Sequence, residues 1–300
     1  MPRHGLFSET LVWDSCQTQF KKRAGSQKSR LFHKSGKITS PGNRIFFFTK
    51  PAFPREAENW GVAMPKSLQD FKYLTFDVVG TLIDFEGGLT ECLAGIAAEA
   101  GVVIDAEEAL SLYRAARYSR DADLFPDDLI RVYLAIAPNL GLPVERKFGE
   151  RLRDSAKRWN AFDDSAEALA RLGKDYRLVA MTNARRWAFD YFAKELGSPF
   201  YAAFTADETG TEKPDPVFFE KVFDFVAAEG NSKDEILHVA QSQYHDIGIS
   251  RELGMSNCWI ERRHGQKGYG GTIEPAKFTE PDYHFTSMKG LANAVAAARG

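Results

Sequence analysis

From about residue 64 onward, two kinds of apolar pattern alternate along the chain. Short runs of apolar residues, rich in β-branched and aromatic side chains, predict buried strands, and longer stretches with apolar residues three or four apart predict amphipathic helices. The predicted strands span residues 73–76, 176–181, 201–205, 236–240, 257–261 and 282–285. Strands that alternate with helices form parallel sheets, so the sequence predicts an α/β fold with a doubly wound, Rossmann-like sheet.

Between the first two predicted strands the pattern is helical only. The four helices predicted there span residues 89–101, 106–119, 126–140 and 144–159. They predict an α-helical cap domain at residues 87–160, inserted after the first strand into a core made of residues 64–86 and 161–300. The core helices are predicted at 165–172, 187–196, 216–229, 247–253 and 288–298, and the glycine-rich residues 262–281 are predicted to form a loop.

The first 63 residues have a different composition. They hold eleven Lys or Arg against four Asp or Glu, and no helical or strand period persists in them. We interpret residues 1–63 as a disordered, basic N-terminal extension. Two alternatives are a targeting segment and a true start of the protein at Met64.

Composition excludes several classes of function. The chain of 300 residues has a formal net charge of −2, and because the extension is basic, the rest is acidic, which gives no support for nucleic-acid binding. No apolar run approaches the length of a membrane span. Cys16, Cys92 and Cys258 lie far apart, without metal-ligand spacing, which favours a reduced compartment and a cytoplasmic location. The sequence is compatible with a homodimer.

A single carboxylate marks the end of the first predicted strand. Asp77 follows residues 73–76 directly, and the turn Gly80-Thr81 comes soon after. An acid at the exit of a buried strand is unfavourable unless it is paired or used. Ligands of open α/β sheets bind outside the carboxyl ends of the strands, so Asp77 is placed like a catalytic group. The alternative is an ordinary capping aspartate.

Two other segments carry candidate chemistry. Thr182 and Asn183 follow the strand predicted at 176–181, although both residue types are also common helix caps. Lys213 is followed by two prolines within three residues, which restrict the backbone around it. Most lysines are simply exposed, but this local context favours a specific role.

The pattern Asp-x-x-Gly-Thr that begins at Asp77 resembles the first motif of the haloacid dehalogenase-like hydrolases. The resemblance extends from Met64 to the end of the chain and implies their fold, a Rossmann-like core with a cap. It also implies that Asp77 is the nucleophile and forms an aspartyl ester with the substrate. Thr81, four residues later, is placed with the substrate-binding residues.

The resemblance implies roles for the later motifs. Thr182 and Asn183 would bind the substrate or its leaving group, and Lys213 would neutralise the charge of the nucleophile. A nearby positive charge is expected to lower the pKa of Asp77 and keep it ionised. Asp246, with help from Gln243, would orient the water that hydrolyses the ester.

Two departures from the family's phosphatases indicate the type of reaction. Phosphatases carry a proton-transferring Asp where this chain has Val79 and a magnesium-binding Asp where it has Gln241. A neutral amide is a poor substitute for a carboxylate on magnesium. The resemblance therefore favours the 2-haloacid dehalogenase branch, with a small anionic substrate, no metal ligand and no cofactor. The alternatives are a phosphatase or phosphonatase, for which magnesium would be the cofactor, and a catalytically silent member that binds an anion or a protein partner.

The predicted cap supplies one more candidate. Leu112-Tyr113-Arg114 resembles the Leu-Trp-Arg stretch of 2-haloacid dehalogenases, which implies that Arg114 accepts the leaving halide. Arg117 and Arg120 are close competitors, and exposure on a helix surface would explain any of the three.

Overall fold

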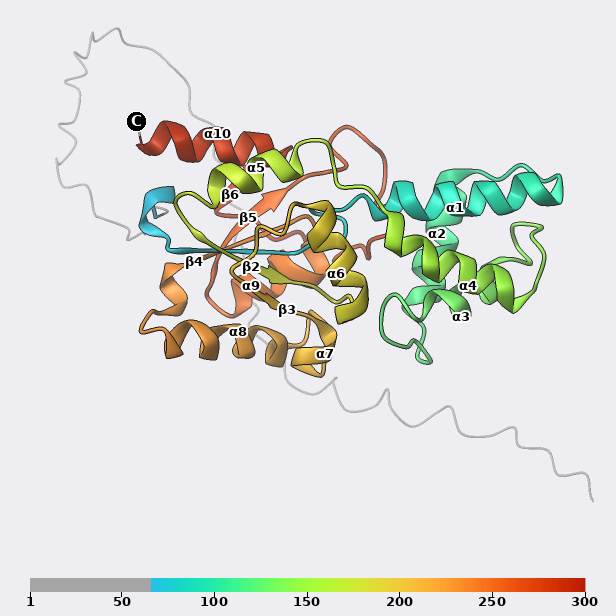
Figure 1. Ribbon diagram of the computed structural model, residues 1–300, viewed down its shortest axis with the longest axis horizontal. Coiled ribbons are helices and arrows are strands. Elements are labelled where there is room, and N and C mark those ends of the chain that lie inside the picture. Colours follow the sequence, from blue (N-terminus) through green and yellow to red (C-terminus); the bar gives the residue numbers. More distant parts are fainter. Residues whose placement is uncertain (1–65, 300) are drawn as a thin grey trace, which may run out of the picture. The chain divides into compact units, whose positions relative to one another are not determined.

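The computed structural model describes residues 66–299, so the predicted extension at residues 1–63 lies outside the described residues. These residues contain a six-stranded, wholly parallel sheet in the order β3-β2-β1-β4-β5-β6 (Figure 1). The strands are β1 (Tyr73–Phe76), β2 (Arg177–Met181), β3 (Ala202–Phe204), β4 (Ile236–Ala240), β5 (Ser256–Ile260) and β6 (Tyr283–Phe285). The predicted fold class is confirmed. From β1 the strands are added in one direction to β3, and from β4 they are added in the opposite direction to β6. The boundary between β1 and β4 is therefore a topological switch point, which is where ligands bind in open α/β sheets.

Helices cover both faces of the sheet, which is why its strands are continuously apolar. Leu74 and Phe76 of β1 pack on one face, in the same core cluster as residues of α5 (Ser165–Leu172), α6 (Arg186–Glu195) and α10 (Met288–Arg299). Tyr73 packs on the other face, with residues of α8 (Pro216–Ala228) and α9 (Gly248–Glu252). Because side chains alternate between the two faces along a strand, only residues of β1 and β4 that point to the same face can contact one another.

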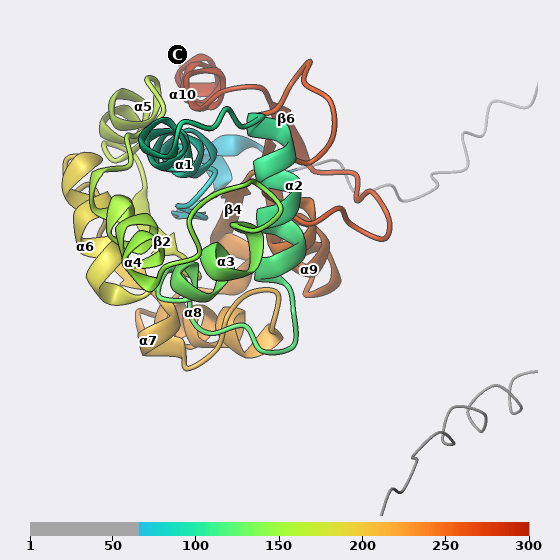
Figure 2. The same ribbon diagram turned by 90° about the vertical axis from the view of Figure 1, so that its right-hand side faces the viewer.

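Four helices lie between β1 and α5, in the segment where the cap is predicted (Figure 2). They are α1 (Phe85–Ala100), α2 (Ala106–Arg117), α3 (Leu129–Ile136) and α4 (Arg146–Ser155), followed by a short 3-10 turn at Ala156–Arg158. The two chain segments that join core and cap are paired, because Asp84 N donates to Asn160 O at 2.9 Å and Phe162 N donates to Leu82 O at 3.0 Å.

The first cap helix begins earlier than predicted. Asp84 caps it, its side chain accepting from Gly87 N at 2.9 Å, so the two glycines lie inside the helix instead of ahead of it. Gly88 is required by packing, since a Cβ there would lie 2.1 Å from the ring of Trp159.

The third cap helix is shorter than the predicted span 126–140. It starts only at Leu129, because the backbone of Phe125 pairs with the core instead: its carbonyl accepts from Arg185 N at 2.8 Å. Pro138 follows its C-terminal end and cannot continue the hydrogen-bonding of the helix.

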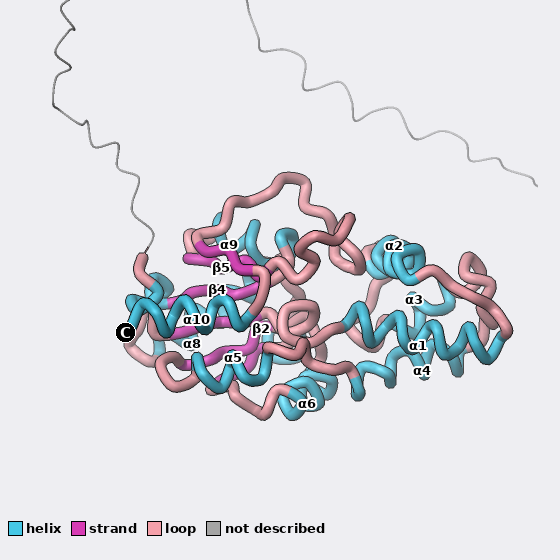
Figure 3. Tube along the Cα trace, turned by 90° about the horizontal axis from the view of Figure 1, so that it is seen from above, coloured by secondary structure: helices cyan, strands magenta, loops and turns pink. Residues whose placement is uncertain are grey.

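In the core, the short helix α7 (Ala206–Thr209) and a π-helical turn, η4 (Gln243–Ile247), were not predicted. The 3-10 turns at Leu68–Asp70 and Lys233–Glu235 were not predicted either. The predicted loop at residues 262–281 is confirmed, since it contains neither helix nor strand. Figure 3 shows this loop leaving β5 and extending toward α2, where Gly270 O accepts from the Arg114 side chain at 2.5 Å. Among residues 66–299 no helix is both long and apolar enough to cross a membrane.

Candidate active site

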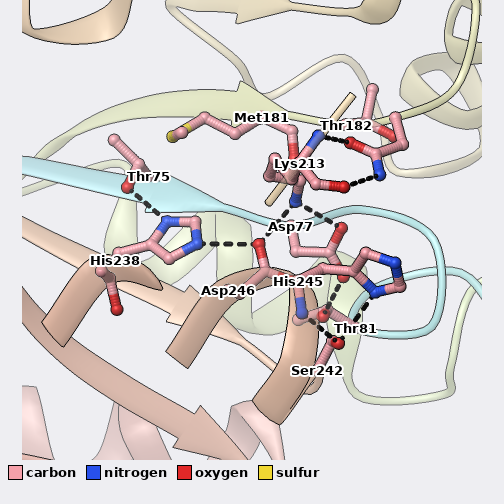
Figure 4. A network of polar contacts seen from close by, with 12 residues as sticks. Thr75, Asp77, Thr81, Met181, Thr182, Lys213, His238, Ser242, His245 and Asp246 are labelled. Atoms are coloured by element: carbon pink, nitrogen blue, oxygen red, sulfur yellow. Dashed lines mark hydrogen bonds and ion pairs between the residues drawn. The ribbon is translucent and has the colours of Figure 1, made fainter. Parts of the chain in front are cut away.

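A buried lysine joins two carboxylates at the switch point of the sheet (Figure 4). Lys213 Nζ lies 3.0 Å from Asp77 Oδ1 and 2.6 Å from Asp246 Oδ1, and it donates to Met181 O at 2.9 Å. Asp77 follows β1, Asp246 lies in η4 after β4, and Lys213 precedes α8. The structure therefore brings the three predicted catalytic residues together, and one ammonium group balances two carboxylates.

Asn183 fixes the backbone that presents Lys213. Its Oδ1 accepts from Lys213 N at 2.7 Å, and its Nδ2 donates to Lys213 O at 2.9 Å. Pro216 occupies the first turn of α8, and Asp215 caps that helix, so the chain leaves the site in a defined direction. Asn183 therefore positions the lysine, and it also lines the cavity described below.

Thr81 holds the carboxylate of Asp77. Its hydroxyl donates to Asp77 Oδ2 at 2.6 Å and accepts from Gln241 N at 2.9 Å. Gly80 makes this turn possible with φ of +92°, a conformation that favours glycine. Thr81 is fully buried and does not line the cavity, so it orients Asp77 and does not contact a substrate directly.

The two carboxylates differ in acidity. Burial disfavours the charge on Asp246, but Lys213 and the hydrogen bond from His238 outweigh it and lower the pKa of Asp246 to about 2. Burial raises the pKa of Asp77; Lys213 opposes this only in part, and the charge of Asp246 adds to it. The prediction of a lowered pKa for Asp77 is therefore wrong, because the single ammonium is shared with a second, better-stabilised carboxylate.

A cavity of about 360 Å³ lies over the three charged residues and is closed on one side by the cap. The core contributes Asp77, Lys213, Asp246, Asn183, Ser242 and His245, and the cap contributes Phe85, Tyr113, Arg117, Tyr118, Ser119 and Phe125. Phe85 and Phe125 both lie against the ring of Trp159, with ring centroids 6.4 and 5.9 Å from it. The cavity thus combines a charged floor with a largely aromatic roof.

The predicted halide-binding arginine does not line this cavity. Arg114 turns toward the loop at 262–281, whereas Arg117, three residues later, is buried and lines the cavity. Arg117 Nη2 donates to both carboxylate oxygens of Glu212 at 2.9 Å, and its Nη1 lies 3.6 Å from Asp128. The two arginines lie three residues apart on α2. The sequence therefore identified both as candidates but could not show which one faces the cavity.

Two other predicted substrate contacts are also turned away. Thr182 is buried, and its Oγ1 accepts from Ala184 N at 3.2 Å. The alternative that Thr182 or Asn183 caps a helix is wrong, since α6 begins at Arg186 and its N-cap is Arg185. The Oε1 of Gln243 accepts from Thr279 N at 3.0 Å, and Gln243 lines a neighbouring cavity of about 260 Å³. Neither residue lines the cavity over Asp77.

His245 lines the cavity but was not singled out from the sequence. His245 Nδ1 lies 3.0 Å from Ser242 Oγ, and its Nε2 lies 3.2 Å from the hydroxyl of Tyr118, on the cap. Burial lowers the pKa of His245 to about 4, so the ring is neutral at neutral pH. Its position next to Asp246 in the chain is the signal that could have identified it.

The residues present do not fit a magnesium site of the phosphatase kind. Lys213 lies between the two carboxylates that would have to share a metal ion, and Val79, which lines the cavity, has no side-chain oxygen. Gln241 also lines the cavity, but its amide is neutral and donates to Thr272 Oγ1 at 3.1 Å. Among residues 66–299, no group of three or more His, Cys, Asp or Glu has a metal-binding arrangement.

Comparison with known proteins identifies the family. The family model described as haloacid dehalogenase-like hydrolase matches residues 71–243, which is more than half of the chain. The chain belongs to the haloacid dehalogenase-like hydrolases, in agreement with the fold and with the motif at Asp77. A comparison with curated proteins gives no significant match.

Solved structures share the fold at low sequence identity. The L-2-haloacid dehalogenase PA0810 is 22% identical, with a TM-score of 0.61, covering 76% of this chain and 99% of its own. The L-2-haloacid dehalogenase from Xanthobacter autotrophicus is 20% identical, with a TM-score of 0.60 and coverage of 75% and 98%. The HAD-hydrolase YfnB from Bacillus subtilis, solved with magnesium, is 16% identical, with a TM-score of 0.62 and coverage of 75% and 99%.

Proposed function

We propose that this hydrolase removes halide from a small 2-haloacid through an ester on Asp77. The observation that carries the proposal is the cluster of Asp77, Lys213 and Asp246, which has a nucleophile, a second carboxylate and a cation. The cavity has no carboxylate at Val79 or Gln241, the two positions where a phosphatase of this family needs one. Displacement of halide at carbon needs neither, because a halide leaves without being protonated.

In the first step, a carboxylate oxygen of Asp77 attacks the carbon that carries the halogen. A carbon–oxygen bond forms, the carbon–halogen bond breaks, and the halide leaves with the bonding electrons. Thr81 and Lys213 each hold one oxygen of Asp77, which orients the carboxylate for attack. Arg117 and the hydroxyl of Tyr118 lie in the same cavity and offer donors to the halide or to the substrate carboxylate.

In the second step, water attacks the carbonyl carbon of the Asp77 ester. Asp246 takes one proton from that water and passes it to the leaving oxygen as the ester bond breaks, which releases the 2-hydroxy acid. The second proton of the water is lost to solvent. Lys213 balances the negative charge that develops between the two carboxyl groups. Asp77 is regenerated as a carboxylate.

A substrate panel tests the proposal directly. Chloroacetate, bromoacetate, both enantiomers of 2-chloropropanoate and an aryl phosphate are offered with and without EDTA, and halide and phosphate release are measured. We expect halide release that EDTA does not inhibit, together with a mass increase on the peptide that contains Asp77 in a single turnover. Phosphate release that requires magnesium would favour the phosphatase alternative, and the absence of any ester would favour a silent, ligand-binding member.

A further inference from the structure

A fully buried histidine lies behind the second carboxylate. His238, in the middle of β4, places its Nε2 3.0 Å from Asp246 Oδ1 and its Nδ1 2.8 Å from Thr75 Oγ1 (Figure 4). Thr75 is the register partner of His238 on β1, so the central strands of the sheet place the two side chains together. The chain of contacts runs from Thr75 through His238 to the carboxylate.

The proton on the ring can be assigned from its partners. A carboxylate oxygen only accepts hydrogen bonds, so Nε2 donates to Asp246 whether or not the ring is charged. When the ring is neutral, Nδ1 accepts from the hydroxyl of Thr75. His238 therefore supplies a directed donor to one oxygen of Asp246.

The two donors to Asp246 leave its other oxygen free. Lys213 and His238 both bind Oδ1, whereas Oδ2 is buried and has no partner among the described residues. A buried carboxylate oxygen without a donor is unfavourable, and such groups are rare outside functional sites.

We infer that His238 is a positioning residue that holds Asp246 with Oδ2 available to take the proton from the hydrolytic water. The inference rests on the proposed function, because it assigns His238 to the second step of that reaction. His238 has no hydrogen bond to Asp77, which attacks in the first step. The ester should therefore form normally without His238 and be hydrolysed slowly.

Two substitutions at His238 separate positioning from packing. His238→Leu removes the donor, whereas His238→Gln keeps an amide Nε2 the same number of bonds from the backbone. Phe219→Leu is the matched control, because the Phe219 ring packs edge-on against His238 at 5.6 Å between centroids and forms no hydrogen bond with Asp246. Melting temperatures of all three variants report on folding.

The first measurement follows 2-chloropropanoate turnover by rapid quench and intact mass. For His238→Leu we expect a halide burst of one equivalent at the unchanged rate, accumulation of ester, and a steady rate lower by about 10- to 100-fold, which corresponds to one hydrogen bond to a charged group. His238→Gln should recover most of the rate, and Phe219→Leu should not accumulate ester. Equal slowing of burst and steady rate in His238→Leu, without ester, would overturn the inference.

The second measurement does not depend on the reaction. The pKa of the Asp246 carboxyl is followed by carbon NMR in the unmodified protein and in both His238 variants. We expect the pKa to rise in His238→Leu and to return toward its original value of about 2 in His238→Gln. An unchanged pKa in His238→Leu contradicts the inference. Absence of halide release and ester in the unmodified protein contradicts the proposed function instead.

Discussion

Among residues 66–299, a buried cation lies between two carboxylates in two places. The lysine cluster consists of Lys213, Asp77 and Asp246, on the floor of the cavity. The arginine cluster consists of Arg117, Glu212 and Asp128, and it joins cap helix α2 to the core segment just before Lys213. Both cations are buried, so charge balance alone does not distinguish the two clusters.

They differ in how completely their oxygens are hydrogen-bonded. Both oxygens of Glu212 accept from Arg117, and Oε1 also accepts from Phe125 N at 3.1 Å. Both oxygens of Asp128 accept from Arg131, at 2.6 and 2.7 Å. In the lysine cluster, by contrast, Asp246 Oδ2 has no hydrogen-bond partner within residues 66–299, and the pKa of Asp77 is raised. The carboxylates that fasten the cap have a donor on every oxygen. In the lysine cluster both oxygens of Asp77 are also hydrogen-bonded, and the carboxylate with a free oxygen is Asp246.

The largest effect is expected from Asp77→Asn, which removes the nucleophile. Turnover should fall by roughly 10⁴-fold or more, the order seen when other enzymes lose their nucleophile. Folding should be kept, and the melting temperature should stay the same or rise, because one of two buried like charges is lost. Halide release measures the turnover, and a thermal melt measures the folding. Normal turnover by the folded variant would rule out the mechanism, and mass spectrometry should exclude deamidation back to Asp.

The next largest effect, on the free energy of unfolding, is expected from removing either of the two cations. Lys213→Met leaves two buried carboxylates without a cation and should lower the free energy of unfolding by about 3–5 kcal/mol. Arg117→Met should cost less, about 1–3 kcal/mol, since Arg131 and Phe125 N still bind the carboxylates that it leaves. Urea denaturation measures both losses.

A double variant checks the reason for that difference. Adding Asp77→Asn to Lys213→Met should restore part of the lost stability, because one of the two uncompensated charges is gone. Equal losses for Lys213→Met and Arg117→Met, or no recovery in the double variant, would contradict the contrast between the clusters.

The sequence was most informative where a residue's role follows from a strand end. Asp77 was predicted as a catalytic group because it follows a strand end, where ligands of open α/β sheets bind. The roles of Lys213 and Asp246 were predicted from the resemblance to the haloacid dehalogenase-like hydrolases. Side-chain direction within a helix or turn was less predictable. Arg114 and Arg117 differ by less than one helical turn, and Gln243 lies in a π-helical turn that directs it toward Thr279.

Features that depend on tertiary packing could not be predicted from the local sequence pattern. His238 lies in an apolar strand, where nothing in the sequence indicates that Thr75 and Asp246 surround it. The sign of the pKa shift of Asp77 also depends on how one cation is shared between two acids, which only the folded geometry shows.

A smaller effect is expected in the pH dependence of ester formation. Asp77 attacks only when ionised, so the rate should fall as pH drops through its pKa, which lies above the ordinary value of 3.8. Asp246, with its pKa near 2, stays ionised over that range. In Asp246→Asn the ammonium belongs to Asp77 alone, so the acid limb of the burst rate should move to lower pH. A limb that stays in place would show that Asp246 does not raise the pKa of Asp77.

The pKa shifts of Asp77 and Asp246 also determine how the stability of the fold changes with pH. The lowered pKa of Asp246 stabilises the fold above the ordinary aspartate range, and that contribution is lost as pH falls toward 2. The raised pKa of Asp77 acts in the opposite direction, because its ionisation on raising the pH destabilises the fold. Asp77→Asn should therefore gain stability, relative to the unmodified protein, as pH rises through that range.

The smallest effect is expected from removing metal. Magnesium prefers near-octahedral oxygen coordination with carboxylates, and here Lys213 already balances Asp77 and Asp246 while Gln241 is bonded to Thr272. A dication placed there would compete with an ammonium group for the same two oxygens. We therefore expect full halide release in excess EDTA and no detectable hydrolysis of an aryl phosphate. Restoring the missing acids in Val79→Asp/Gln241→Asp should strengthen magnesium binding in calorimetry, with the unmodified protein as control. Strict dependence of the unmodified protein on magnesium would mean that the lysine cluster does not exclude a metal, and it would favour the phosphatase alternative.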